Sequence, residues 1–244
     1  MCAVWVVREQ VFVAALDCGE STLAQSILGS LQKMFPQSTR VAKLEGMQME
    51  ALGMYDDALK LYNDILQKEP TCAEIWRRKV AVLKAQRDVD EAIKEMNEYL
   101  KVFMCDHEAW LELSELQISM QNYADAAYCL EEVLLSNPHN HLYHQRYAEI
   151  HYTLGGPESY TLACKHYAKA IKLNPRNIRA LYGYHISLCA VISSTKGSKV
   201  LKEKKEVLEW VSAQIKKVYS EYCSEDRVQL VEETLKRLEP SQRQ

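Results

Sequence analysis

The sequence predicts an all-α fold built from repeated pairs of helices. Its 244 residues include only 8 Gly and 6 Pro, which is sparse for an all-β architecture with its many tight turns. Small residues recur every 34 positions, at Ala24, Ala58, Ala92 and Ala126. Prolines share this period, at Pro36, Pro70 and Pro138. A period of this length is typical of a solenoid of helix pairs, which we expect to coil into a right-handed superhelix.

The repeat sets the expected units, one helix pair each, at about 5–38, 39–72, 73–106, 107–140 and 141–177. In the fifth unit Ala163 and Pro175 keep the Ala-to-Pro distance of 12 but arrive three residues late. We place this insertion at the turn sequence 154–157, Leu-Gly-Gly-Pro. The turn is expected to separate the two helices of the unit.

A degenerate pair is expected over 178–222, with its first helix at 178–192 and a polar loop at 193–198. It completes a solenoid domain spanning 1–222. The segment Arg227–Leu238 then carries apolar residues at helical spacing: Val228, Leu230, Val231, Leu235 and Leu238. We expect 223–244 to form a capping helix, followed by a frayed tail at 239–244.

The units match the tetratricopeptide pattern of small, aromatic and proline positions. The fourth unit shows it as Trp110-x2-Leu113-Ser114, then Ala126-x3-Leu130, then Pro138. Small residues at Gly46, Ser114 and Ala148 are expected where the first helix crosses the second, opposite the periodic alanines. Each proline is expected to end a second helix, because it cannot donate the helical hydrogen bond.

Composition excludes several classes of protein. The formal charge of −3 gives no overall attraction to nucleic acid. The apolar run Val11–Leu16 is far shorter than the roughly 18–20 residues of a spanning helix. It also follows Arg8-Glu9-Gln10 and lacks the cleavage site of a signal peptide. The eight cysteines are scattered with no C-x2-C pair, so we expect reduced thiols in the cytosol, mostly in the core.

Neither catalysis nor a cofactor is expected. The sequence contains no nucleophile elbow, Walker loop, G-x-G-x-x-G or H-E-x-x-H motif. Four histidines lie close together in sequence, at His139, His141, His144 and His151. Only His144 and His151 share a helical face, and Cys105-Asp106-His107 lies one unit back. A zinc site needs four converging ligands, so we do not expect a metal site.

A helix-pair solenoid has a concave face lined by the first helices, which binds extended segments or partner domains. The residues expected on this face mix charged and apolar types, as non-obligate interfaces do. From the second and third units they are Arg40, Lys43, Met47, Glu50, Glu74, Arg77, Ala81 and Lys84. From the fourth and fifth units they are Glu108, Leu111, Glu115, Ile118, Leu142, Gln145, Glu149 and Tyr152.

Charge is unevenly distributed along the chain. No Lys or Arg occurs between Lys101 and Arg146, a stretch with seven carboxylates, whereas cations dominate from Lys165 to Lys217. These residues form either ordinary solvated helix faces or a polarised scaffold whose ends prefer different partners. The cluster Lys196–Lys205 also suggests, more weakly, contact with anionic lipid head groups.

One class of tetratricopeptide protein clamps the C-terminal carboxylate of cytosolic chaperones with Lys, Asn and Arg side chains. Aligned in phase, this chain offers Lys43 but Met47, then Arg78, and then Glu108 and Glu112 where cations are required. Carboxylates at those positions repel an incoming carboxylate. This counts against a chaperone clamp, and a free adaptor that binds peptides or chaperones is kept only as the alternative interpretation.

Several stretches go beyond the generic repeat. They are Glu9-Gln10-Val11, Ala14-Ala15-Leu16-Asp17, Tyr55-Asp56-Asp57-Ala58, Leu61-Tyr62, Ile65-Leu66-Gln67, Asn97-Glu98-Tyr99-Leu100, Ala126-Ala127-Tyr128-Cys129-Leu130-Glu131-Glu132 and Asn137-Pro138-His139-Asn140-His141-Leu142-Tyr143. On these residues the chain resembles the family of subunit 2 of the ER membrane protein complex, from Trp5 to about Tyr222.

The resemblance implies a non-catalytic scaffold on the cytosolic face of the endoplasmic reticulum membrane. The family's complex inserts tail-anchored and multipass proteins, and its subunit 2 holds the cytosolic parts of subunits 3 and 5 and a soluble subunit of the 8 or 9 type. Family members carry a further helical segment ahead of the position of Val4-Trp5-Val6-Val7. We therefore expect a shortened isoform or paralogue with Val4, Val7 and Val11 exposed, one that depends more on its partners for solubility.

Overall fold

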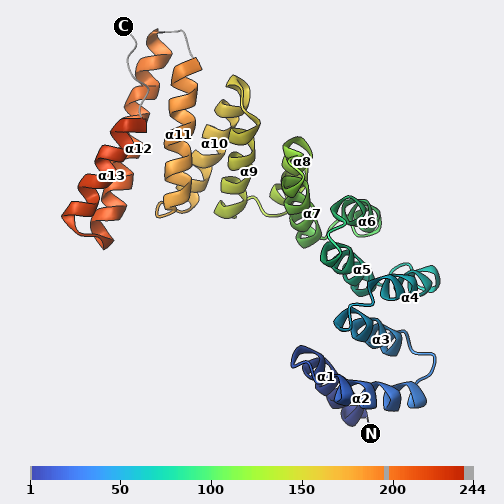
Figure 1. Cartoon of the computed structure of the whole chain (residues 1–244). Coiled ribbons are helices and arrows are strands. Elements are labelled where there is room, and N and C mark those ends of the chain that lie inside the picture. The colour runs from blue at the N-terminus through green and yellow to red at the C-terminus, as the bar shows by residue number, and fades with distance from the viewer. Residues whose placement is uncertain (1, 195–197, 239–244) are drawn as a thin grey trace. The chain divides into compact units, whose positions relative to one another are not determined.

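A computed structural model describes residues 2–194 and 198–238. Within these ranges every regular element is an α-helix and no strand occurs, which confirms the all-α helix-pair fold (Figure 1). The helices are α1 Cys2–Asp17, α2 Ser21–Met34, α3 Thr39–Ala51, α4 Tyr55–Lys68, α5 Ala73–Ala85, α6 Val89–Val102, α7 His107–Ser119, α8 Tyr123–Ser136, α9 His141–Leu154, α10 Pro157–Leu173, α11 Ile178–Ser194, α12 Ser198–Tyr222 and α13 Glu225–Leu238.

The chain divides into two compact units, Met1–Asp106 with α1 to α6 and His107–Gln244 with α7 to α13. Each unit buries its own apolar residues. In the first, Phe12, Leu28 and Leu44 pack together. In the second, Leu181 and Ile215 belong to one large cluster. The boundary between the units falls between the third and fourth helix pairs.

The turns that follow α2, α4, α8 and α10 each contain a proline, whereas the turn after α6 has Met104 at that position. Helices α4 and α8 each end two residues before a proline. Glu69, which precedes Pro70, has φ −130° and ψ 77°, and Asn137, which precedes Pro138, has φ −132° and ψ 67°. A proline ring disfavours helical backbone in the residue before it, so these sequences end the second helix of a pair.

The turn inside each of the first five pairs contains a residue with left-handed backbone. Such residues recur every 34 positions with φ between 61° and 76°, at Gly19, Gly53, Arg87, Gln121 and Gly155. Glycine adopts this conformation at little cost, whereas a residue with a Cβ is strained there. The three glycines are a repeat signal that adds to the alanines.

The three additional residues of the fifth unit lengthen α10. This helix has 17 residues, where α4, α6 and α8 have 14. Gly155 keeps its phase with Gln121, and Pro157 takes the first helical position, where a missing N–H leaves no hydrogen bond unmade. The insertion therefore belongs to the start of α10, immediately after the turn expected to contain it.

Small residues lie where the helices of a pair cross. The four periodic alanines from Ala24 to Ala126 are all 0% exposed. Gly46 of α3 faces Tyr62 of α4 so closely that a Cβ at Gly46 would lie 2.6 Å from the Tyr62 hydroxyl oxygen. Ser114 is buried on α7, and its hydroxyl donates to the Ala126 carbonyl of α8 over 3.3 Å. Burial of Ala148 completes the expected set of small crossing residues.

The last helix, α13, begins two residues before the predicted segment. Its Leu235 is buried with Val211 and Ile215 of α12, whereas Leu230 is 64% exposed. Helix α11 continues to Ser194, two residues into the predicted polar loop. Residues 195–197 of that loop, Lys196 among them, and the predicted frayed tail at 239–244 lie outside the described residues.

Candidate functional site

The candidate protein-binding residues lie on the first helices of successive pairs. In unit Met1–Asp106 they are on α3 and α5, and in unit His107–Gln244 they are on α7 and α9. Residues three and four apart share one side of a helix, so each helix contributes one row of side chains. Each unit therefore has its own first-helix face.

Charged residues on the first unit's face bind one another across neighbouring helices. Arg40 on α3 contacts both carboxylate oxygens of Glu9 on α1, at 2.5 Å from Nη2 and 2.8 Å from Nε. Lys43 on α3 pairs with Glu74 on α5. The hydrogen bond from Lys43 lowers the pKa of Glu74, and the bond to Glu9 raises the pKa of Arg40. Opposite charges thus connect α1 to α3 and α3 to α5.

Glu50 connects three helices of the first unit. It accepts a hydrogen bond from the Tyr62 hydroxyl of α4, and its other oxygen lies 3.1 Å from Nη1 of Arg78 on α5. Burial, and then the bond to Glu50, raises the pKa of Tyr62, so its hydroxyl remains a donor. Glu50, which was predicted to face a partner, therefore also connects helices α3, α4 and α5.

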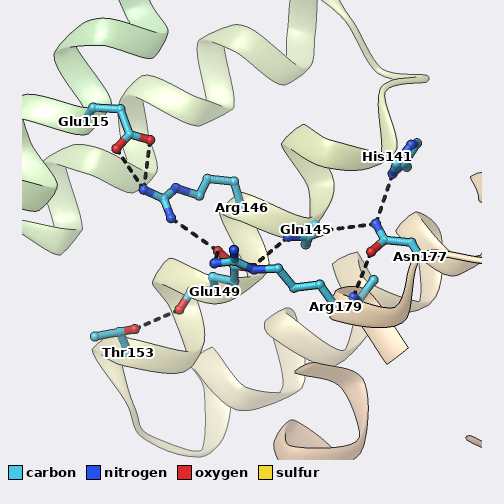
Figure 2. Close-up of polar contacts among 9 residues, drawn as sticks. Glu115, His141, Gln145, Arg146, Glu149, Thr153, Asn177 and Arg179 are labelled. Atoms are coloured by element: carbon cyan, nitrogen blue, oxygen red, sulfur yellow. Dashed lines mark hydrogen bonds and ion pairs between the residues drawn. The ribbon is translucent and has the colours of Figure 1, made fainter. Parts of the chain in front are cut away.

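The second unit's face carries an alternating row of acidic and basic side chains over three helices (Figure 2). Arg146 on α9 donates through Nη2 to both oxygens of Glu115 on α7, each at 2.8 Å. Arg179 on α11 donates to Glu149 on α9, over 2.6 Å and 3.1 Å. Nη1 of Arg146 also lies 3.4 Å from a carboxylate oxygen of Glu149, and this contact connects the two ion pairs into one row. We call Glu115, Arg146, Glu149 and Arg179 the charge ladder.

A network of amide side chains contacts the charge ladder at Glu149 (Figure 2). Gln145 donates to Glu149 over 2.9 Å and accepts from Asn177 over 2.8 Å. Asn177 also bonds a ring nitrogen of His141 at 3.0 Å, and its Oδ1 accepts the Ala180 N–H, which caps the start of α11. The Glu149 carboxylate is therefore fixed by neighbours on its own helix and the next first helix.

Two predicted face residues are buried instead. Met47 and Gln145 are each only 8% exposed. Met47 packs in the cluster of Phe12 and Leu44, and Gln145 belongs to the amide network. This corrects their assignment to an open surface, because residues of α1 cover Met47, and Asn177, at the start of α11, covers Gln145.

The remaining predicted residues differ in exposure. Leu111 and Ile118 are half-buried against the cluster around Leu130. Lys43, Glu50 and Glu149 are half-buried in their ion pairs. The exposed residues are Arg40, Glu74, Arg77, Ala81, Lys84, Glu108, Glu115, Leu142 and Tyr152.

Four charged partners were missed by sequence reasoning: Glu9, Arg78, Arg146 and Arg179. The sequence feature that could have identified them is a residue of opposite charge at a separation slightly shorter than the 34-residue repeat. The Arg40–Glu9 and Arg146–Glu115 pairs are each 31 residues apart, and the Arg179–Glu149 pair is 30 apart. Neighbouring first helices are separated by about 34 residues, so a pair close to that spacing is placed across the contact between them.

Among the residues that the structure describes, His144 and His151 of α9 contact other protein groups rather than forming a cluster that would hold a metal ion. Nδ1 of His144 lies 3.1 Å from Nδ1 of His166 on α10, and its Nε2 lies 3.0 Å from the Pro138 carbonyl. Burial, and then His144, lowers the pKa of His166 to about 4. His151 stacks on Tyr147 with ring centroids 4.4 Å apart. Over residues 2–194 and 198–238, no three His, Cys, Asp or Glu side chains are grouped so that they would hold a metal ion.

Helix α1 exposes apolar side chains at Val4, Val7 and Val11, as expected. On its other side Trp5 packs edge-on against Phe35, with ring centroids 5.5 Å apart. None of the helices in the described part of the chain combines the length and the apolar character needed to cross a bilayer.

The comparisons with known proteins agree with this geometry. The family model for the EMC2 TPR-like repeat domain matches residues 27–166. The chain is 48% identical over 217 residues to ER membrane protein complex subunit 2-A of Xenopus laevis, a match covering 88% of this chain and 73% of the frog protein. It is 36% identical over 235 residues to ER membrane protein complex subunit 2 of Dictyostelium discoideum, covering 91% of this chain and 72% of that protein.

Among solved structures, the fold is similar to that of YrrB, described as a TPR protein with an unusual peptide-binding site. The TM-score is 0.57 and the identity 12%, over 85% of this chain and 97% of YrrB. At that identity the likeness concerns the fold alone. The sequence matches extend through both compact units, and the chain belongs to the family of ER membrane protein complex subunit 2.

Proposed function

We propose that this chain is a non-catalytic scaffold subunit of an ER membrane protein complex. The observation that carries the proposal is the 48% identity to a protein named as subunit 2 of that complex, over 88% of this chain. In this role the chain lies on the cytosolic face of the endoplasmic reticulum membrane, attached through its partners. It supports insertion of tail-anchored and multipass proteins by holding the cytosolic parts of subunits 3 and 5 and a soluble subunit of the 8 or 9 type.

The first-helix faces support a holding role. Several of their charges are paired within each unit, by the Arg40–Glu9 pair in the first and the charge ladder in the second. Side chains that are already fixed lose little freedom when a partner docks, so less of the interaction energy is spent on ordering. Leu142 and Tyr152 of α9 stay exposed beside the ladder and provide apolar contact area.

Affinity purification of the tagged chain from cells lacking their own copy of the subunit tests the proposal. The expected result is a fixed set of membrane subunits in near-equal amounts. The variant Leu142→Asp/Tyr152→Asp should lose part of this set, because it places charge in the apolar contact. Leu230→Asp on α13 is the matched control, since Leu230 is also exposed, and it should recover the full set.

Recovery of chaperones or of varied short-motif clients would overturn the scaffold proposal and support a free adaptor. The geometry gives such an adaptor little support. Lys43, the cation available for a carboxylate clamp, is paired with Glu74. Glu108 and Glu112 occupy the positions where a clamp needs cations. We therefore expect no measurable binding of an acidic peptide with a free C-terminal carboxylate.

A further inference from the structure

The outer side of α8 exposes large apolar side chains. Tyr128 is 57% exposed and Leu135 is 77% exposed. They are seven residues apart, so they lie on the same side of the helix about 10 Å from each other. Ala124 is exposed on the same side, one turn before Tyr128. Isolated exposed apolar residues are common, but a row along one helix indicates a contact surface.

Carboxylates surround this row without compensating cations. Helix α8 contains Asp125, Glu131 and Glu132 and no Lys or Arg. Glu131 accepts a hydrogen bond of 2.6 Å from the Tyr147 hydroxyl, a neutral donor that leaves its negative charge in place. In the part of the chain that the structure describes, neither Asp125 nor Glu132 takes part in an ion pair. We call Asp125, Tyr128, Glu131, Glu132 and Leu135 the α8 patch.

The α8 patch differs from the first-helix face of the same unit. On that face Glu115 and Glu149 are neutralised by Arg146 and Arg179. In sequence, the cations nearest to α8 are Lys101, 22 residues before its first residue, and Arg146, 10 residues after its last, and Arg146 is paired with Glu115 and Glu149. The negative potential of the patch is therefore available to a partner.

Tyr128 is also held in place. Its ring packs edge-on against Trp110 of α7, with ring centroids 6.0 Å apart and an interplanar angle of 79°. An exposed aromatic side chain that is already fixed by a neighbour pays little entropy on binding, and such residues are common anchors of interfaces.

We propose that the α8 patch docks a basic amphipathic helix of a partner protein. Apolar side chains one and two turns apart on that helix cover Tyr128 and Leu135, and its Lys and Arg residues approach the carboxylates on both sides. Charge complementarity selects a cationic partner, and the spacing of the two apolar residues matches one face of a helix. The proposal goes beyond the scaffold role, because it concerns a second helix rather than the first-helix faces.

Fluorescence anisotropy with the purified full-length chain tests the proposal. The probe is a labelled peptide of Leu and Lys, about 14 residues or four turns long, with Leu at one helical face. A peptide with Glu in place of Lys is the charge control. We expect the Leu–Lys peptide to bind and the Leu–Glu peptide not to bind. Leu135→Ser should weaken binding about tenfold, as expected for losing most of one buried leucine.

Two further variants separate the contributions. Asp125→Asn/Glu132→Gln should weaken binding and flatten its dependence on salt, because the screened charge interaction is reduced. The matched control is Leu230→Ser/Glu233→Gln on α13, which removes an exposed leucine and a carboxylate from a helix that also carries cations. It should leave the dissociation constant unchanged.

Equal binding by the wild type and Leu135→Ser, or an equal loss in the α13 control, would overturn the docking proposal. Leu135 lies mostly in solvent, so its replacement should keep the fold, and circular dichroism checks this. Failure here leaves the scaffold proposal intact, since that one depends on which subunits are recovered with the chain.

Discussion

Replacing Gly46 with alanine would place a methyl group in space that Tyr62 already fills. The added Cβ would lie 2.6 Å from both Cζ and the hydroxyl oxygen of Tyr62. Tyr62 is 0% exposed and donates its hydroxyl to Glu50, so its ring cannot move away without losing packing and that hydrogen bond. Overpacking costs about 1–3 kcal/mol and the hydrogen bond about 1 kcal/mol, while alanine recovers about 1 kcal/mol of helix preference. We expect the free energy of unfolding to fall by about 1–3 kcal/mol.

Gly29 provides the matched control in the same unit. It lies in the interior of α2, and a Cβ at this position meets nothing within 4 Å. Gly29→Ala should therefore raise the free energy of unfolding by up to about 1 kcal/mol. Urea unfolding followed by far-ultraviolet circular dichroism measures both variants. If Gly46→Ala proved as stable as Gly29→Ala, the close crossing of α3 and α4 would be refuted.

Three more predictions concern the second unit. Gln121→Gly should raise the melting temperature, with about 1 kcal/mol of added stability, because Gln121 holds a left-handed φ of 61°; a lower melting temperature would contradict the strain. Glu149→Gln should lower the free energy of unfolding in urea by about 1–2 kcal/mol, because it removes the charge that Arg179 and Arg146 share. The loss should be smaller at high salt. An unchanged urea midpoint at low salt would show that the charge ladder adds no stability. Stability should fall as pH drops from 7 toward 4, because the unfolded state binds protons near pH 6.5 while His166 in the folded state resists protonation down to about pH 4. Protonation of His166 in the unfolded state alone should lower the free energy of unfolding by about 2 kcal/mol at pH 5, relative to neutral pH. If the unfolding of the His166→Asn variant had the same pH dependence as that of the wild type, this assignment would be refuted.

Much of the fold could be predicted because its determinants repeat in the sequence. An alanine such as Ala58 is needed wherever two helices cross closely, and a proline such as Pro70 ends a second helix. Both requirements are local and recur at the same interval, so a one-dimensional pattern identifies them. The left-handed turn position was harder to find, because Arg87 and Gln121 replace glycine in two of the five turns. Their backbone is fixed by the surrounding helices rather than by their own preference.

The candidate face was predicted less completely, because a period gives the direction of a side chain but not what covers it. Met47 was predicted to lie on an open face, yet Phe12 and other residues of α1 and α2 bury it. The charge pairs depend on contacts between successive first helices, which a single helix pattern does not contain. Glu9 was therefore missed, although it lies within one repeat of its partner Arg40.

The internal pairing of the first-helix charges changes where binding specificity is expected to come from. Every ion pair within a unit, such as Arg146 with Glu115, removes a charge that a partner would otherwise need to match. Replacing such a residue is then expected to reduce stability before it reduces affinity. Affinity should instead respond to exposed apolar residues such as Leu142 and to Asp125 and Glu132 of α8, which form no ion pair with any residue that the structure describes. Replacing these residues should leave the packing of the helix pairs intact. A mutational scan that measures both the free energy of unfolding and the recovery of partners would separate the two groups of residues. Replacing an ion-paired residue between helices should change both quantities, whereas replacing an exposed contact residue should change only the recovery of partners.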